Sequence, residues 1–236
     1  RSRIELHTRT HGAGNGNSNY RYNGVAFYDA GGVLDNLEIK SIRDTPFSGA
    51  QHGVAIYAYV YGSTARSIKI ENCDIYDFQK NGMALNGDNL YVEVYNNTVT
   101  GVGQTGVTAQ NGIQLWDAVG VVDNNTVSDI WYTGGGWAAA GGLYYFSDNL
   151  IITNNTFDGN MYGIYAYGND DCDFSNNEFL NGDVGILLYD ADNAILLNNY
   201  YDNNTYAVWV YNSLNATAAN SAFVNNTYDI VFGGTA

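Results

Sequence analysis

Residues 163–167 read GIYAY, residues 185–189 read GILLY and residues 207–211 read AVWVY, so one short block returns every 22 residues. The second and fourth residues of each copy are apolar, which is the alternation expected of a β-strand that buries one face. An amphipathic helix would need apolar residues at i, i+3 and i+4, and the blocks lack that spacing. Strands that return at a fixed interval predict a repeat architecture of stacked coils.

The block recurs along most of the chain, and nearly every copy begins with Gly. The copies begin at Gly24, Gly53, Gly82, Gly112, Gly142, Gly163, Gly185, Ala207 and Asp229. We expect the side chains one and three residues after each of these positions to face the core. At Gly142 this predicts that Leu143 and Tyr145 point inward and that Tyr144 points outward.

A second block, a hydrophobic residue followed by Asn, lies between successive copies of the first. Its Asn residues are Asn36, Asn72, Asn96, Asn124, Asn154, Asn176, Asn198 and Asn220. A sharp corner between two sheets requires a left-handed backbone, which Asn adopts more readily than most residues. Stacked Asn amides can also hydrogen-bond along a column. The second block therefore predicts a corner in every coil.

Short strands in repeats of 21 to 30 residues are typical of a parallel sheet wound into a cylinder. We predict an all-β fold, a single-stranded parallel β-helix (a solenoid) of about nine coils that stack ~4.8 Å apart. Residues 24–236 form this single domain, and residues 1–23 lead into the first coil. Leucine-rich repeats have a similar period, but their Leu signature and helical segment are missing.

Four segments carry a resemblance to a known family. They are NGIQL at 111–115, NNTF at 154–157, YGIYAYGN at 162–169 and VGILLYDADNAILLNN at 184–199. These segments resemble the repeats of the pectate-lyase-like superfamily, and especially of the NosD-like, carbohydrate-associated β-helix proteins. The resemblance implies a right-handed β-helix. It implies no single activity, because the repeat occurs in lyases, epimerases, glycosidases, phage spikes and adhesins.

The charge of the chain is distributed unevenly. The formal net charge is −15, all nine Lys and Arg lie between Arg1 and Lys80, and the residues after Lys80 include acids but no base. Such a surface repels phosphate and anionic lipid, so we expect no nucleic-acid partner. No run of about 18 apolar residues occurs, so we expect no membrane span. A neutral glycan or calcium is a more natural ligand.

The sequence begins at Arg1 without a signal peptide, so we expect any export signal to have been removed. The coil architecture leads us to expect an exported protein that is extracellular or on the cell surface. Cys73 and Cys172 lie about four coils apart in the predicted register, too far for a disulfide. We predict that both are buried thiols.

A polar corner before the Gly position is the first candidate site. Two columns are predicted there, one of Gln51, Lys80 and Gln110 and the next of His52, Asn81 and Asn111. Lyases of the resembled family use a Lys or Arg base, which makes His52, Lys80 and Arg43 the candidate catalytic residues. The alternative is a hydrogen-bonded corner without chemistry.

An acidic column is the second candidate, because Asp148, Asp170 and Asp192 recur at 22-residue spacing. Carboxylates stacked one coil apart repel one another unless solvent or a cation lies between them. The column predicts a calcium site, and its alternative is a solvated edge. No cofactor is required by any motif.

An aromatic stripe is the third candidate. We predict a ligand-binding or partner-binding face made of Trp116, Tyr144, Phe146, Tyr165, Tyr167, Tyr189, Trp209 and Tyr211. Exposed rings can stack on sugars or pack against another subunit. The alternative is that these rings turn inward and form a core ladder.

Among the N-x-S/T sequons, three fall outside the Asn corner. Asn203, Asn215 and Asn225 are therefore the predicted glycosylation sites, in a host that glycosylates.

The last predicted strand, Ile230 to Phe232, is followed only by residues 233–236. We expect an uncapped coil there, which either a continuation of the chain in the full protein or another copy covers. The second case predicts a homo-oligomer or filament formed by head-to-tail stacking. The leading hypothesis is an exported, non-catalytic surface or structural protein that self-assembles through coil ends and the aromatic face. One alternative is a polysaccharide lyase or epimerase near Lys80 and His52, and another is a glycan-binding module.

Overall fold

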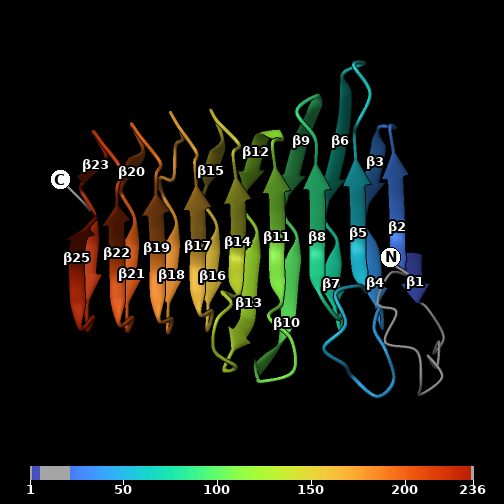
Figure 1. Ribbon diagram of the computed structural model, residues 1–236, viewed down its shortest axis with the longest axis horizontal. Coiled ribbons are helices and arrows are strands. Elements are labelled where there is room, and N and C mark those ends of the chain that lie inside the picture. The colour runs from blue at the N-terminus through green and yellow to red at the C-terminus, as the bar shows by residue number, and fades with distance from the viewer. Residues whose placement is uncertain (1, 6–21, 235–236) are drawn as a thin grey trace.

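The computed structural model describes residues 2–5 and 22–234 (Figure 1). The coils contribute strands to two nine-stranded parallel sheets and, on the third side, to a five-stranded and a two-stranded parallel sheet, and the described residues contain no helix. No helix long and apolar enough to cross a membrane therefore occurs in the described part of the chain. Coils follow one another along the long axis in sequence order, from β2 at one end to β25 at the other. The predicted parallel β-helix is confirmed.

Within each sheet the strands follow one another along the solenoid in the order of their numbers. Sheet B contains β2 (Asn23–Tyr28), β5 (Val54–Tyr59), β8 (Asn81–Asn86), β11 (Asn111–Trp116), β14 (Ala140–Tyr145), β17 (Tyr162–Tyr167), β19 (Val184–Tyr189), β22 (Tyr206–Tyr211) and β25 (Tyr228–Gly233). Sheet A contains β1 (Ser2–Glu5), β4 (Leu37–Lys40), β7 (Asp74–Tyr76), β10 (Thr98–Thr105), β13 (Thr126–Tyr132), β16 (Thr156–Asp158), β18 (Glu178–Leu180), β21 (Tyr200–Asp202) and β24 (Ala222–Val224). Sheet C contains β3 (Gly32–Asp35), β6 (Arg66–Glu71), β9 (Leu90–Tyr95), β12 (Val119–Asp123) and β15 (Ile151–Thr153), and the pair β20 (Ile195–Leu197) and β23 (Thr217–Ala219) continues its side.

The inward file predicted from the repeat is present. Ile164 pairs with Ile186, and Ile186 pairs with Val208, so these residues lie directly over one another on successive coils. All three are buried in one continuous core. The alternation of the first block therefore determines which side of sheet B faces inward.

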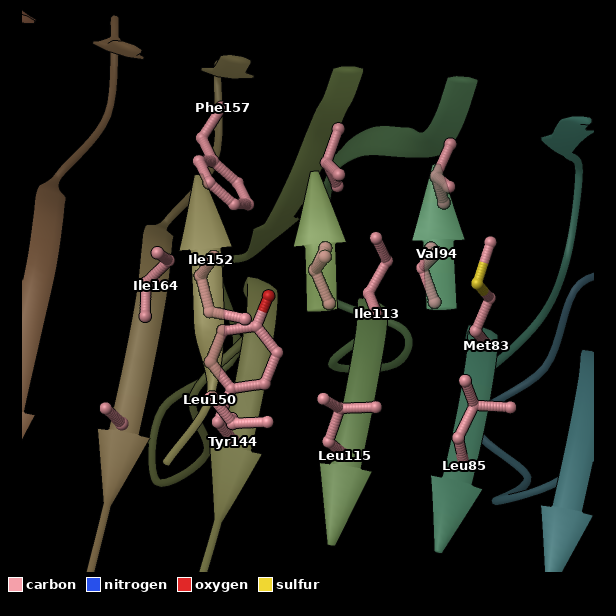
Figure 2. Packing of buried hydrophobic residues seen from close by; sticks show 14 of the residues in the cluster. Met83, Leu85, Val94, Ile113, Leu115, Tyr144, Leu150, Ile152, Phe157 and Ile164 are labelled. Atoms are coloured by element: carbon pink, nitrogen blue, oxygen red, sulfur yellow. The ribbon is translucent and has the colours of Figure 1, made fainter. Parts of the chain in front are cut away.

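The register predicted for β14 is wrong by one residue. Ile113 pairs with Gly142 and Leu115 pairs with Tyr144, so the first block starts at Gly141 rather than Gly142. Tyr144 is 0% exposed and points into the core (Figure 2), whereas Tyr145 lies on the outward side. Two adjacent glycines look alike in sequence. The structure distinguishes them because the Tyr144 hydroxyl lies 2.6 Å from where a Cβ at Gly142 would be.

The register predicted for β5 is wrong by two residues. Ile56 pairs with Val25 on one side and with Met83 on the other, so Ala55 and not Gly53 begins the block. A shift of two preserves the alternation, so Ile56 still faces the core. Because of this shift, the loop residues before β5 do not lie over the residues before β8 with which the sequence repeat aligned them.

The small residue that begins most copies of the first block has a steric reason. A Cβ at Gly163 would lie 2.6 Å from Phe179 Cδ1 and 2.5 Å from the Gly185 carbonyl oxygen. Phe179 belongs to a ladder of stacked rings in sheet A, which was not predicted. The ladder is formed by Phe157, Phe179, Tyr201 and Phe223, with ring centroids 4.9 to 5.4 Å apart. Small residues in sheet B therefore make room for large rings in sheet A.

The predicted Asn corner is confirmed at all eight positions. Each of these Asn residues has a φ between 55° and 59°, the left-handed conformation that a sharp corner requires. Amides also bond along the column in places, as where Asn124 Nδ2 donates to Asn96 Oδ1 at 2.6 Å.

A second column of Asn, one residue further along the chain, is buried. It consists of Asn97, Asn125, Asn155, Asn177 and Asn199. Asn177 is typical: its Oδ1 accepts the backbone N–H of Asn155 at 2.9 Å, and its Nδ2 donates to the Ile152 carbonyl at 2.8 Å. Each buried amide thus satisfies backbone groups that the corner leaves without strand partners.

The two cysteines are free and buried, as predicted. Burial raises the pKa of the Cys172 thiol to about 12, so this thiol stays protonated at neutral pH.

Candidate functional site

The outward face of sheet B differs from the other faces of the solenoid. None of its three outward positions per strand carries Asp, Glu, Lys, Arg or His. The outward sides of sheets A and C do carry charges, for example at Lys40 and Glu178 in sheet A and at Lys69 in sheet C. An uncharged face on a chain of net charge −15 marks a surface suited to contact.

Aromatic rings contact one another along this face from β11 to β22. Trp116 lies 5.4 Å from Tyr145, and Tyr145 lies 5.7 Å from Tyr167. The row continues through Tyr189 to Tyr211, with centroids 5.1 and 4.8 Å apart. A second group sits beside it, where Tyr206 contacts both Trp209 and Tyr228.

The rings of the predicted aromatic face lie outside the core except at one position, and their role in binding stays a prediction. Tyr144 lies in the core, because of the one-residue register error, and Tyr145 takes its place outside. The other predicted members lie on the outward side or in the turn after it: Trp116, Phe146, Tyr165, Tyr167, Tyr189, Trp209 and Tyr211.

Amides replace the rings on β8, and on β11 at the two outward positions before Trp116. Gln114 bridges two residues of the previous coil, since its Oε1 accepts from Asn81 Nδ2 at 3.0 Å and its Nε2 donates to Asn86 Oδ1 at 3.1 Å. This part of the face is therefore polar but still uncharged.

A pocket of 510 Å³ lies where β5, β8 and β11 end, and we call it the Tyr59–Trp116 pocket. Its aromatic walls are Tyr57, Tyr59, Tyr61 and Trp116, and its polar lining includes Asn86, Asp88 and Asp117. Burial, and then the charge of Asp88, raise the pKa of Asp117. Sequence reasoning missed this pocket, because Tyr61, Asp88 and Asp117 come after the strands and belong to no repeated block.

A second pocket, of 390 Å³, lies at the opposite ends of the same strands, and we call it the Lys80 pocket. Tyr132, Trp137 and Gln51 line it together with Lys80, whose Nζ donates to the Ala109 carbonyl. Burial lowers the pKa of Lys80 to about 8. No carboxylate of the described residues lies within ion-pair distance of this amine.

The predicted polar columns form only in part. Asn81 pairs with Asn111, which places Lys80 beside Gln110 as expected. Val54 rather than His52 pairs with Asn81, so His52 and Gln51 are displaced by the two-residue shift at β5.

His52 faces a buried polar cluster instead of the Lys80 pocket. Its Nε2 lies 3.0 Å from Asp44 Oδ2, and its ring lies 4.7 Å from that of Tyr22. Burial acts to raise the pKa of Asp44, but hydrogen bonds from Ser48 and His52 outweigh it and keep the pKa below its ordinary value. The Tyr22 hydroxyl donates to the same carboxylate. This cluster joins the loop before β5 to the solenoid.

Arg43, the third predicted catalytic residue, pairs with Asp77 at 2.8 Å and lies over the Phe47 ring. The structure therefore does not bring Arg43, His52 and Lys80 into one pocket: of the three, only Lys80 lines the 390 Å³ pocket.

The acidic column is present, and its carboxylates bond the backbone. Asp148 Oδ1 accepts the N–H of Asp170 at 2.9 Å, and Asp170 Oδ1 accepts the N–H of Asp192 at 2.9 Å. Among the described residues, no group of three or more His, Cys, Asp or Glu is arranged to hold a metal ion. Calcium binding at Asp148, Asp170 and Asp192 stays a prediction.

The three predicted glycosylation sites are exposed and have a left-handed backbone. Their amides donate along the solenoid, as Asn203 does to Asn181 and Asn215 to Asn193. Asn225 donates to Asp202. Glycosylation stays a prediction.

Comparison with known sequences bears on the fold. The family described as "Right handed beta helix region" matches residues 14–179 and, in a second alignment, residues 52–228. The chain belongs to the right-handed β-helix family. The match supports the handedness implied by the sequence resemblance, while the NosD-like and pectate-lyase-like subgroups stay predictions. No curated protein matches the chain.

Among solved structures, this β-helix is similar to a GH136 lacto-N-biosidase from Eubacterium ramulus. The TM-score is 0.53 and 14% of the residues are identical. The alignment covers 98% of this chain and 48% of that one, so this β-helix spans about half the length of the enzyme. At this identity the likeness concerns the fold alone.

Proposed function

We propose that this protein is an exported, non-catalytic β-helix of the cell surface or extracellular space that associates with further copies of itself through the outward face of sheet B. The observation that carries the proposal is the absence of charge from that face, together with its row of rings from Trp116 to Tyr211.

The size of the face suits this role. Strands about 4.8 Å apart and about 20 Å long give nine strands a face on the order of 800 Å². One partner contributes about that area to an interface of standard size. Two such faces can pack at the ~10 Å separation of sheet sandwiches, since no charge would be buried between them.

Stacking of coil ends is a separate proposal. Ile230 and Phe232, on the last described coil, are 41% and 77% exposed. The residues after Gly234 lie outside the described part of the chain. Sedimentation and imaging of the protein test this second mode of assembly.

Sedimentation velocity over a concentration series tests the face. Wild-type protein is expected to sediment faster as its concentration rises, and Tyr189→Glu to weaken association at least a hundredfold because it buries an unpaired charge. Tyr91→Glu, on the outward side of sheet C, is the matched control and should leave association unchanged. A wild-type protein that stays monomeric throughout would contradict the proposal.

A polysaccharide lyase or epimerase is the second candidate, favoured by the Lys80 amine of lowered pKa in a pocket. A neutral amine could remove the proton beside a uronate carboxylate. Uronate polymers incubated with the protein would then gain the ultraviolet absorbance of unsaturated products, and Lys80→Met would abolish the gain. If the absorbance does not change with wild-type protein, the lyase hypothesis is excluded.

A further inference from the structure

The Tyr59–Trp116 pocket has aromatic rings with accessible surfaces. Tyr61 is 67% exposed, and Tyr59 and Trp116 are each 44% exposed. In the regular part of the same face the rings pack closely on their neighbours, as Tyr189 does on Tyr211 at 4.8 Å. Tyr59 and Tyr61 lie 5.7 Å apart and are tilted by 38°, so they form a bent wall instead of a closed stack. The pocket can therefore take a flat apolar group against its walls.

The polar lining of the pocket contains acceptors that the fold does not use. Asp29, Asp148 and Asp170 also come after sheet B strands, and each accepts a backbone N–H of another coil. The carboxylates of Asp88 and Asp117 make no hydrogen bond or ion pair with another described residue. Both remain available to accept hydrogen bonds from a ligand.

A donor lies beside these acceptors. Gln114 Nε2 donates to Asn86 Oδ1, which fixes the orientation of that amide. The Asn86 Nδ2 is then left as a donor at the pocket lining. A simple cation would use the carboxylates and the rings but would have no use for this donor. A ligand rich in hydroxyl groups uses all three kinds of group.

The charge of the pocket restricts the ligand further. Asp88 and Asp117 are close enough that the charge of Asp88 raises the pKa of Asp117. A uronate would add a third carboxylate to this pair and be repelled. The volume of 510 Å³ lies within the range of roughly 300–1,000 Å³ typical of small-ligand pockets.

We propose that the Tyr59–Trp116 pocket binds a neutral oligosaccharide. The rings stack on the apolar faces of the sugar, Asp88 and Asp117 accept hydrogen bonds from its hydroxyls, and Asn86 donates one. The pocket shares Tyr57, Tyr59 and Trp116 with the face proposed for self-association, but the row of rings proposed to join two copies continues on β17, β19 and β22, away from the pocket.

The test is a calorimetric titration of the protein with neutral tetrasaccharides, including β-linked glucose, galactose and N-acetylglucosamine series. Tetragalacturonate and choline serve as the anionic and cationic probes. We expect saturable binding of at least one neutral sugar and none of either charged probe. The sugar should be recovered intact by mass spectrometry.

Variants locate the binding. Trp116→Ala should weaken it at least tenfold, whereas Trp209→Ala, the same change on β22 outside the pocket, should leave it unchanged. The double variant Asp88→Asn with Asp117→Asn should reduce the preference for neutral sugar over tetragalacturonate. Urea unfolding of each variant verifies that the fold is retained.

Four results would overturn the inference. These are no saturable sugar binding by the wild-type protein, equal losses in Trp116→Ala and Trp209→Ala, binding of choline or tetragalacturonate at least as tight as that of any neutral sugar, and cleavage of the sugar. Sedimentation of the same samples separates the two proposals, because self-association that persists while sugar binding fails overturns this inference only.

Discussion

The first coils of the β-helix are long and irregular, whereas the later ones are short and uniform. Val25 to Ile56 takes 31 residues and Ile113 to Gly142 takes 29, but Ile164 to Ile186 and Ile186 to Val208 take 22 each. The Lys80 pocket and the Tyr59–Trp116 pocket both lie in the long coils. Twenty-two residues are enough to close a coil, so the additional residues of the first coils are free to build sites.

The two regions nevertheless share one core. Inward apolar files, small residues at the start of the first block and left-handed Asn corners continue from the long coils into the short ones. The difference between them lies in turns and outward side chains. Stability and binding should therefore respond to different substitutions.

The largest expected effect is a side chain added at the start of the block in a short coil. Gly163→Val places atoms against Phe179 and the Gly185 backbone, and should lower the free energy of unfolding by about 3 kcal/mol. Urea denaturation measures it. Gly112→Val, in a long coil, meets Val127 and the Gly141 backbone and should cost about as much.

Gly135→Val provides the control for both variants. No atom lies within 4 Å of a Cβ at Gly135, in the loop between β13 and β14, so this change should alter stability by about 0.5 kcal/mol at most. Tolerance of Gly112→Val alongside loss of stability in Gly163→Val would show that the two regions do not share one core.

Removing a buried amide should have an intermediate effect. Asn177→Ala leaves the Asn155 N–H and the Ile152 carbonyl without partners, at a cost of about 2 kcal/mol. Asn97→Ala in the long coils leaves the Cys73 N–H and the Ile70 carbonyl without partners and should cost a similar amount. A cost near zero in either variant, by urea denaturation, would mean that water replaces the amide there.

The smallest expected effect is a pH dependence confined to the long coils. Burial lowers the pKa of Lys80 to about 8 from its ordinary 10.5, so the folded chain binds fewer protons than the unfolded chain between these values. Lys80 should therefore make the free energy of unfolding rise with pH from about pH 8 to about pH 9.5, whereas Cys172, whose pKa is raised to about 12 from its ordinary 9.0, lowers that free energy as the unfolded thiol ionises. The rise due to Lys80 is the difference in urea midpoints between the wild-type protein and Lys80→Met across this range. An equal rise in that variant would assign it to another group.

Much of the fold could be predicted, because its signals are local. The left-handed Asn of each corner and the alternation in Ile164, Ile186 and Val208 depend only on backbone preference and on period. The pairing register of strands that are joined by long loops depends instead on contacts between residues far apart in the sequence. Nothing in the alternation separates Gly141 from Gly142, and only the packing of Tyr144 decides between them.

The candidate sites were harder to predict for the same reason. The aromatic row was largely found, since its rings recur with the repeat. The Tyr59–Trp116 pocket was not, since Asp88 and Asp117 meet only through the stacking of two unequal coils. His52 was assigned to the corner of Lys80, and the two-residue shift at β5 places it against Asp44.

In a solenoid, order along the chain becomes position along a rod (Figure 1). The described residues up to Lys80 include six basic and eight acidic ones, and those beyond it include sixteen acidic and none basic. The molecule is therefore a rod with a permanent electric dipole moment along its axis, and the β25 end is its negative end. In a field, or above a positively charged surface, it should orient with the β25 end toward the positive charge.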